Sequence, residues 1–206
     1  MPEEKTTTIA TPQTGWQVFE YEVNLIYKPE IKEFVKKALD AAPPQFWTMP
    51  ASKTGKYHGE DNNRTGGLVH HTKKLVYALR VFIRAMQLEG MRDELIAAGI
   101  LHDIVKDGSR VVRYGAGGNA NWKDHGVCVA QFVSGEVYAG TIPPAGISGA
   151  LQSILRLCAV HMGQWGSGPE TMPRTRAEWA IHMADMMASR KGWIVNDINQ
   201  IHIPEE

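Results

Sequence analysis

Residues 95–106 read LIAAGILHDIVK, a nearly unbroken apolar run that ends in an adjacent histidine and aspartate, His102 and Asp103. A helix of this sequence is apolar almost all round, which predicts that it is buried. Burial would also take the carboxylate of Asp103 out of water, which is unfavourable unless a cation or several donors compensate the charge. A salt-bridged aspartate beside a core histidine and a metal-binding pair both meet that condition, so other parts of the chain must decide between them.

The segments on either side of this stretch have the periodicity of amphipathic helices. Apolar residues recur at three- and four-residue spacing, and Pro-Pro pairs or glycines separate the segments. This pattern predicts helices from Pro29 to about residue 40 and over residues 68–86, 92–106, 124–133, about 146–161 and 175–191. We therefore expect an all-α, single-domain helical bundle.

Less regular segments connect these helices. Residues 45–67 and 109–122 have no sustained pattern and predict irregular loops, and the second leaves room for a short hairpin around residues 111–114. Residues 15–27 mix alternation with aromatic content, so helix and strand both remain open there. We expect residues 1–28 to form a partly disordered N-terminal extension, residues 29–192 the helical domain, and residues 193–206 a C-terminal tail that packs as an extended strand.

Composition excludes several classes of protein. The 206 residues carry 22 lysines and arginines against 22 aspartates and glutamates, so no overall field attracts nucleic acid or an anionic membrane. The two cysteines, Cys128 and Cys158, lack a Cys-x-x-Cys spacing, which argues against a disulfide framework and a thiolate zinc site. We expect no leader peptide, because residues 1–8 lack a basic segment followed by an apolar one, and no run approaches eighteen apolar residues. We expect a cytoplasmic protein without a membrane partner, and an oligomer is compatible with the sequence.

Several of the predicted helices carry a side chain that binds cations. These are His71, the His102-Asp103 pair, His125 or His161, and Asp185. His71 belongs to the inward stripe of its helix, whereas His70 lies about 100° round it. Imidazole and carboxylate without thiolate suit divalent manganese, iron, cobalt, nickel or zinc, and tolerate magnesium at the carboxylate end.

The order of these motifs closely resembles the HD-domain metal-dependent phosphohydrolases over roughly residues 45–191. The motifs are GLVHHT at 67–72, LHDIVKDG at 101–108, DHG at 124–126, VHMGQWG at 160–166 and HMAD at 182–185. The resemblance implies that the family's H…HD…D pattern falls on His71, His102, Asp103 and Asp185, and that His125 and His161 match two further histidines of two-metal members. Met162 stands where some relatives have another histidine, so one ion and two ions both remain open.

The resemblance also implies an activity and the residues that support it. The expected reaction is hydrolysis of a phosphoester of a small nucleotide, a nucleoside monophosphate or deoxynucleoside triphosphate, with one or two divalent ions. Asp103, Lys106 and His125 are the implied catalytic residues. The candidates for substrate binding are Lys53, His58, Arg64, Lys106 and Arg190.

Three alternatives stay open. The segments at 50–52 and 56–58 followed by Gly66-Gly67 resemble the entry segment of HD-type 3′→5′ exoribonucleases, but only about 45 residues precede the match and a basic-aromatic strand-binding patch is missing, so RNA is the second choice of substrate. A non-catalytic HD protein would bind metal and nucleotide without turnover. An oxidative HD enzyme would use two iron ions and dioxygen.

Overall fold

The computed structural model describes residues 13–52, 59–106 and 124–191. In these residues the chain is helical, with no strand, and forms a single bundle, which confirms the all-α fold that the sequence predicts. The hairpin expected near residue 111 and the extended C-terminal tail lie outside the described residues. None of the helices in the described part is long and apolar enough to cross a bilayer.

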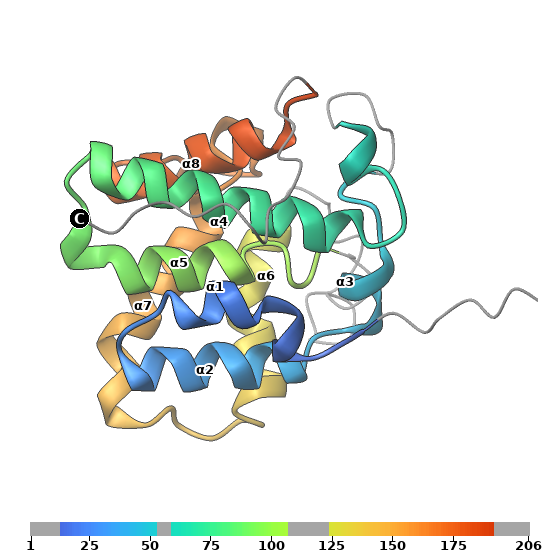
Figure 1. The fold of residues 1–206 in the computed structure, drawn as a ribbon. Coiled ribbons are helices and arrows are strands. Elements are labelled where there is room, and N and C mark those ends of the chain that lie inside the picture. The colour runs from blue at the N-terminus through green and yellow to red at the C-terminus, as the bar shows by residue number, and fades with distance from the viewer. Residues whose placement is uncertain (1–12, 53–58, 107–123, 192–206) are drawn as a thin grey trace, which may run out of the picture.

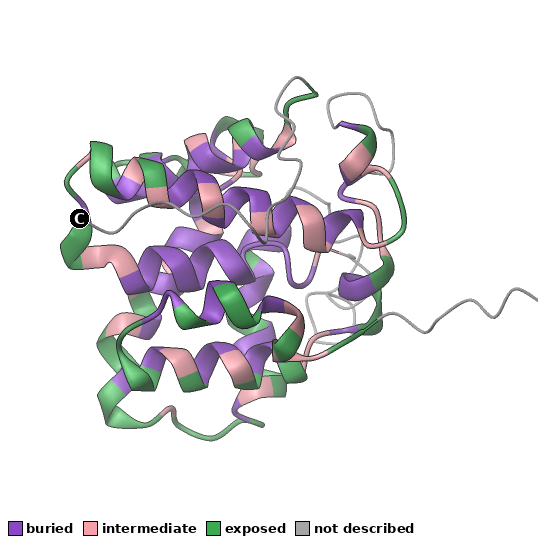
Figure 2. Cartoon of the chain, in the orientation of Figure 1, coloured by how far each residue is buried: buried purple, intermediate pink, exposed green. Residues whose placement is uncertain are grey.

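Helix α5, Arg92–Leu101, lies in the middle of the bundle (Figure 1). Helices α4, Gly67–Ala85, and α8, Arg176–Ser189, lie on one side of it, and α1, Glu20–Asn24, and α2, Pro29–Asp40, on the other. Helices α6, His125–Phe132, and α7, Ala145–Val160, pack together, and α7 also packs on α5. Every residue of α5 after Arg92 is buried, and the surrounding helices bury one face each (Figure 2).

The apolar stripes read from the sequence form this core. In α2, Pro29 occupies the first turn, where its missing N–H leaves no helical bond unmade, and Ile31, Phe34, Val35, Ala38 and Leu39 are buried. Burying each large apolar side chain contributes about 1.5–3 kcal/mol relative to leaving it exposed. Helix α8 begins at a capping box, because the Thr175 hydroxyl accepts from the Glu178 amide and the Glu178 carboxylate accepts from the Thr175 amide.

The structure differs from the sequence-based boundaries in three places. Helix α5 ends at Leu101 rather than Lys106, because Ile104 and Lys106 donate to the carbonyls of Leu101 and Asp103 in tighter i−3 turns. The segment 45–67 is not wholly irregular, since it contains α3, Pro44–Thr48, with Phe46 and Trp47 buried, and the 3-10 turn η2, Glu60–Asn62. Helix α6 continues into one π-helical turn, η6, Val133–Val137.

The core also begins before residue 29. The 3-10 turn η1, Trp16–Phe19, leads into α1, and Phe19, Val23 and Ile26 are fully buried in the same hydrophobic core as the central helices. Phe19 stacks on Phe46 of α3 with 6.0 Å between ring centroids. Residues 16–24 are therefore helical, and residues 16–26 are part of the bundle.

Candidate metal centre

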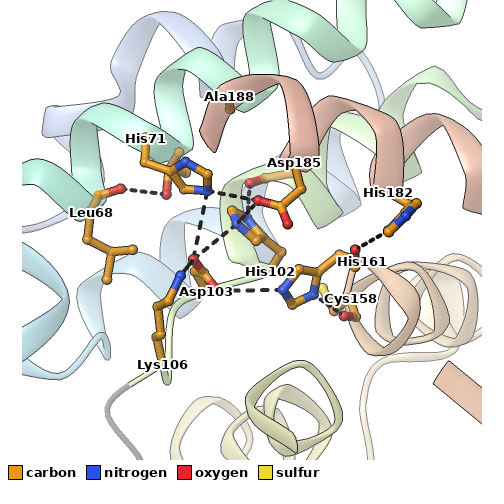
Figure 3. A network of polar contacts seen from close by, with 12 residues as sticks. Leu68, His71, His102, Asp103, Lys106, Cys158, His161, His182, Asp185 and Ala188 are labelled. Atoms are coloured by element: carbon orange, nitrogen blue, oxygen red, sulfur yellow. Dashed lines mark hydrogen bonds and ion pairs between the residues drawn. The ribbon is translucent and has the colours of Figure 1, made fainter. Parts of the chain in front are cut away.

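Six side chains from five segments of the chain meet inside the bundle, and Figure 3 labels all of them except His125. They come from α4, from the turn after α5, from the start of α6, from the C-terminal cap of α7, and from α8. The residues are His71, His102, Asp103, His125, His161 and Asp185. All six are buried, and the most exposed of them, Asp185, has 5% of its surface accessible.

The two carboxylate oxygens of Asp103 face different histidines. Oδ2 lies 3.3 Å from His102 Nε2 and 3.9 Å from His71 Nε2. Oδ1 lies 2.7 Å from His125 Nε2 and 3.6 Å from His161 Nε2. The carboxylate of Asp103 thus lies between two groups of imidazoles.

Asp185 closes the first group from the opposite side. Its Oδ1 lies 3.0 Å from His71 Nε2 and 4.0 Å from His102 Nε2. Two triads, His71 with His102 and Asp185, and His102 with Asp103 and His161, each offer three ligand atoms within 4.8 Å of one another. Ligands that share an ion through bonds of about 2.0–2.2 Å lie about 3–4 Å apart, so this spacing fits a common cation.

Backbone carbonyls set the tautomers of two histidines. His102 Nδ1 lies 2.9 Å from the Gly99 carbonyl, and His161 Nδ1 lies 2.6 Å from the Cys158 carbonyl. A carbonyl only accepts hydrogen bonds, so each Nδ1 carries the proton, and in the neutral ring Nε2 presents a lone pair. Both Nε2 atoms face the cluster, which is the arrangement that metal-ligating histidines use.

Close approach of α6 and α7 brings the second pair of imidazoles together. His125 Nε2 and His161 Nε2 are 3.0 Å apart. Gly126 permits this contact, because a Cβ there would lie 2.4 Å from the Cys158 carbonyl oxygen and 2.9 Å from His161 Nδ1. The glycine after His125 is therefore a packing requirement of the cluster.

Charge in the cluster is arranged to keep the acids ionised. Burial alone would raise the pKa of Asp103, but the Lys106 ammonium, followed by His102 and His125, holds that pKa well below its usual range. Burial, together with the neighbouring rings of His125 and His102, lowers the pKa of His161 to about 3. His161 is therefore a neutral imidazole at neutral pH, the form that binds a metal.

A cation fits this set of donors. His102 Nε2 is buried and has no hydrogen-bond partner among the described residues, and a buried polar atom in that state is costly. His125 Nε2 and His161 Nε2 are only 3.0 Å apart, and His161 carries its proton on Nδ1. A proton or a cation must therefore lie between these two Nε2 atoms. The nitrogen and oxygen donors exclude no first-row divalent ion. Both cysteines are buried free thiols outside the donor set.

Lys106 lies beside the cluster on its more exposed side. Its Nζ is 2.6 Å from Asp103 Oδ2, and 25% of its side chain is accessible to solvent. Two of the other predicted substrate-binding residues lie in the described part of the chain. Arg64, in the turn before α4, and Arg190, at the cap of α8, are exposed and make no hydrogen bond or ion pair to the six residues in the described part of the chain. Lys53 and His58 lie outside that part.

Two residues that the sequence did not assign to the site, His182 and Trp165, make contacts behind His161. His182 Nδ1 donates to the His161 carbonyl over 2.7 Å, and the Trp165 ring stacks on the His182 ring.

His70 does not join the cluster, and its Nδ1 lies 3.1 Å from Asn62 Oδ1. Asn62 is fully buried in η2. Because Asn62 falls in a polar loop sequence, no periodicity or motif singles it out.

Comparison with known protein families, curated proteins and solved structures finds no match to this chain.

Proposed function

We propose that the protein is a metal-dependent phosphohydrolase that cleaves a phosphoester of a small nucleotide. The observation that carries the proposal is the position of the buried Asp103 carboxylate, with imidazoles facing each of its oxygens and the Lys106 ammonium 2.6 Å from Oδ2. The order of motifs along the chain, which resembles the HD-domain phosphohydrolases, supports the same assignment.

The residues present divide the work of such a reaction. His71, His102, Asp103 and Asp185 would hold one divalent ion, and Asp103, His125 and His161 a second. When bound, such ions supply Lewis-acid chemistry, lowering the pKa of water to about 7 and offsetting charge on phosphoryl oxygens. Lys106 would add a positive charge next to Asp103, and its side chain is partly accessible to solvent. The Gly99 and Cys158 carbonyls keep His102 and His161 oriented throughout.

A hydrolysis screen tests this proposal. The purified chain is supplemented with Mn²⁺ and assayed for phosphate or nucleoside release from nucleoside monophosphates, deoxynucleoside triphosphates, cyclic dinucleotides and short RNA. We expect turnover of at least one mononucleotide that falls by about 100-fold or more in Asp103→Ala. Lys37→Ala, at an exposed position of α2, is the control and should keep full activity.

The other possible outcomes of the screen point to other functions. Equal turnover by Asp103→Ala would refute the assigned site. Processive release from RNA alone would assign an exoribonuclease. Bound metal with no turnover of any nucleotide would indicate a binding protein. Iron in the purified protein, together with consumption of dioxygen, would indicate an oxidative enzyme.

A further inference from the structure

Asn62 is a fully buried amide that connects the two helices carrying His71 and Asp185. Its Nδ2 donates to the Ala188 carbonyl of α8 over 3.0 Å, and its Oδ1 lies 3.1 Å from His70 Nδ1 of α4. The first contact fixes the second, because a carbonyl must face the Nδ2 end of the amide. Oδ1 therefore faces His70, and His70 Nδ1 is the donor.

The two tethered points lie next to the candidate ligands. His70 directly precedes His71, and Ala188 lies three residues, about one turn, after Asp185. Between them, His71 Nε2 and Asp185 Oδ1 are 3.0 Å apart. The amide of Asn62 thus spans the same pair of helices, α4 and α8, at the level where they must stay close for both ligands to share an ion.

Asn62 is itself held firmly in place. The backbone carbonyl of Asn62 accepts from the Ala51 backbone N–H over 2.8 Å, and the backbone N–H of Asn62 donates to the Gly59 carbonyl over 3.1 Å. Gly67, the first residue of α4, packs on that carbonyl, since a Cβ at Gly67 would lie 2.1 Å from the Asn62 oxygen. Beside it, the buried ammonium of Lys74 pairs with Asp61 over 3.2 Å. These contacts hold the backbone of Asn62 in place, so its side chain bonds to α4 and α8 from a fixed position.

We infer that Asn62 is a positioning residue for the candidate metal centre, setting the distance between α4 and α8 so that His71 and Asp185 bind one ion together. This inference rests on the proposed function only in requiring that the centre binds a cation. Residues behind the ligands usually change metal affinity by about 10- to 100-fold when they are altered. Asn62 acts on the ligands through the backbones of both helices rather than by touching them.

Titration of the full chain with Co²⁺, followed by its visible absorption, tests the inference. Co²⁺ absorption reports the geometry of its ligands as well as its affinity. We expect Asn62→Ala to weaken Co²⁺ binding by about tenfold and to change the spectrum, because the His71–Asp185 pair is no longer held at one separation. Ile83→Ala, a buried apolar residue near the far end of α4, is the control, and should lower the melting temperature without changing affinity or spectrum.

If Asn62→Ala fails to fold, a second pair of variants tests the hydrogen bond between Asn62 and His70 by changing His70 of α4. In His70→Asn the amide nitrogen occupies the place of Nδ1 and still donates to Asn62, so wild-type affinity and spectrum are expected. His70→Phe keeps a ring but no donor, and should weaken Co²⁺ binding. Equal affinity and spectra in His70→Phe, His70→Asn and wild type would overturn the inference and leave the metal centre standing. Failure of the wild type to bind Co²⁺ would overturn both.

Discussion

Asp103 is a buried carboxylate, and its ionised form depends on the charged and hydrogen-bonding groups around it. Its carboxylate is 1% exposed, and an ionised carboxylate at that depth is stable only when its partners are in place. Lys106 is the nearest formal positive charge and the first of the groups that keep the pKa of Asp103 low. Removing such a partner leaves a buried charge uncompensated.

Lys106→Met separates this electrostatic role from metal binding. The methionine keeps much of the length of the side chain and loses the ammonium. We expect kcat for the nucleotide substrate to fall by about 100-fold, because a charge near the phosphate is lost. Divalent-ion affinity should stay within about threefold of wild type, since all six candidate ligands remain. Steady-state kinetics and a Mn²⁺ titration check the two expectations, and a parallel loss of both would assign Lys106 to holding the ion.

Gly126→Ala tests how tightly α6 and α7 must approach. The added methyl would meet the Cys158 carbonyl and the ring of His161, so the helices must separate. We expect the free energy of unfolding to fall by about 1–3 kcal/mol, as in other overpacked sites, and Mn²⁺ affinity to fall with it. Gly90→Ala, where a Cβ meets nothing within 4 Å, is the control and should change stability by less than about 0.5 kcal/mol. Wild-type affinity in Gly126→Ala would contradict the close packing.

Single residues also show what sequence alone can identify at the site. His102 and Asp103 stand out because two polar residues end an apolar run, and the other four candidates are expected only from the resemblance of their motif order to the HD-domain phosphohydrolases. Asn62 and the carbonyls of Gly99 and Cys158 carry no comparable signal. Their roles depend on contacts such as the Asn62–Ala188 bond, which spans 126 positions and appears only after folding.

At the scale of helices, the start of α8 fixes the position of Asp185. Glu178 lies in its first turn and accepts from Arg156 Nε over 2.7 Å and from the amides of Arg174 and Thr175. Burial favours the neutral form of Glu178, but the hydrogen bonds from Arg156 and the Arg174 amide outweigh it, and its pKa lies below the usual value of 4.5. The ionised carboxylate therefore stabilises the folded state above that pH.

Glu178→Gln should reveal this as a pH-dependent loss. At about pH 7 we expect the variant to lose about 1 kcal/mol of unfolding free energy, the size of a helix-cap contribution. A depressed folded pKa gives stability that is present above the unfolded pKa and disappears as the pH falls through the folded value. The difference from wild type should shrink at about pH 3. Urea unfolding at both pH values measures it, and a constant difference would contradict the role of the charge.

Helix boundaries show where sequence patterns reach their limit. The period of the apolar residues predicts α2, α4 and α7 closely, because each buries one face against α5. It does not predict the end of α5 at Leu101, since Ile104 and Val105 continue the apolar pattern beyond that residue while the hydrogen bonds tighten into i−3 turns. Helix α3 is missed for a different reason: five residues are too few to display a period.

For the whole molecule, we expect ion binding at the candidate centre to be coupled to folding. The six candidate ligands come from segments spread between His71 and Asp185, so an ion that binds them binds the folded chain and not the unfolded one. Without an ion, the carboxylates and imidazoles are held together by packing against partners such as Lys106. We therefore expect the bundle to gain stability when a cation is bound at the candidate centre.

Metal removal should lower the melting temperature accordingly. At a free ion concentration about 100 times the dissociation constant, binding stabilises the fold by about 2.7 kcal/mol. For a chain of this size that corresponds to about 5–10 °C. Thermal unfolding with Mn²⁺ and with a chelator measures the shift, and His102→Ala should show almost none. A shift of the same size in that variant would place the stabilising ion elsewhere.

The most direct test of the central claim is the metal content of the purified chain after equilibration with Mn²⁺ and removal of free ion. The wild type should retain one or two ions per chain. His102→Ala, which removes the residue shared by both triads, should retain few or none. A wild type without stoichiometric metal, or a His102→Ala variant that binds as much as wild type, would contradict the account.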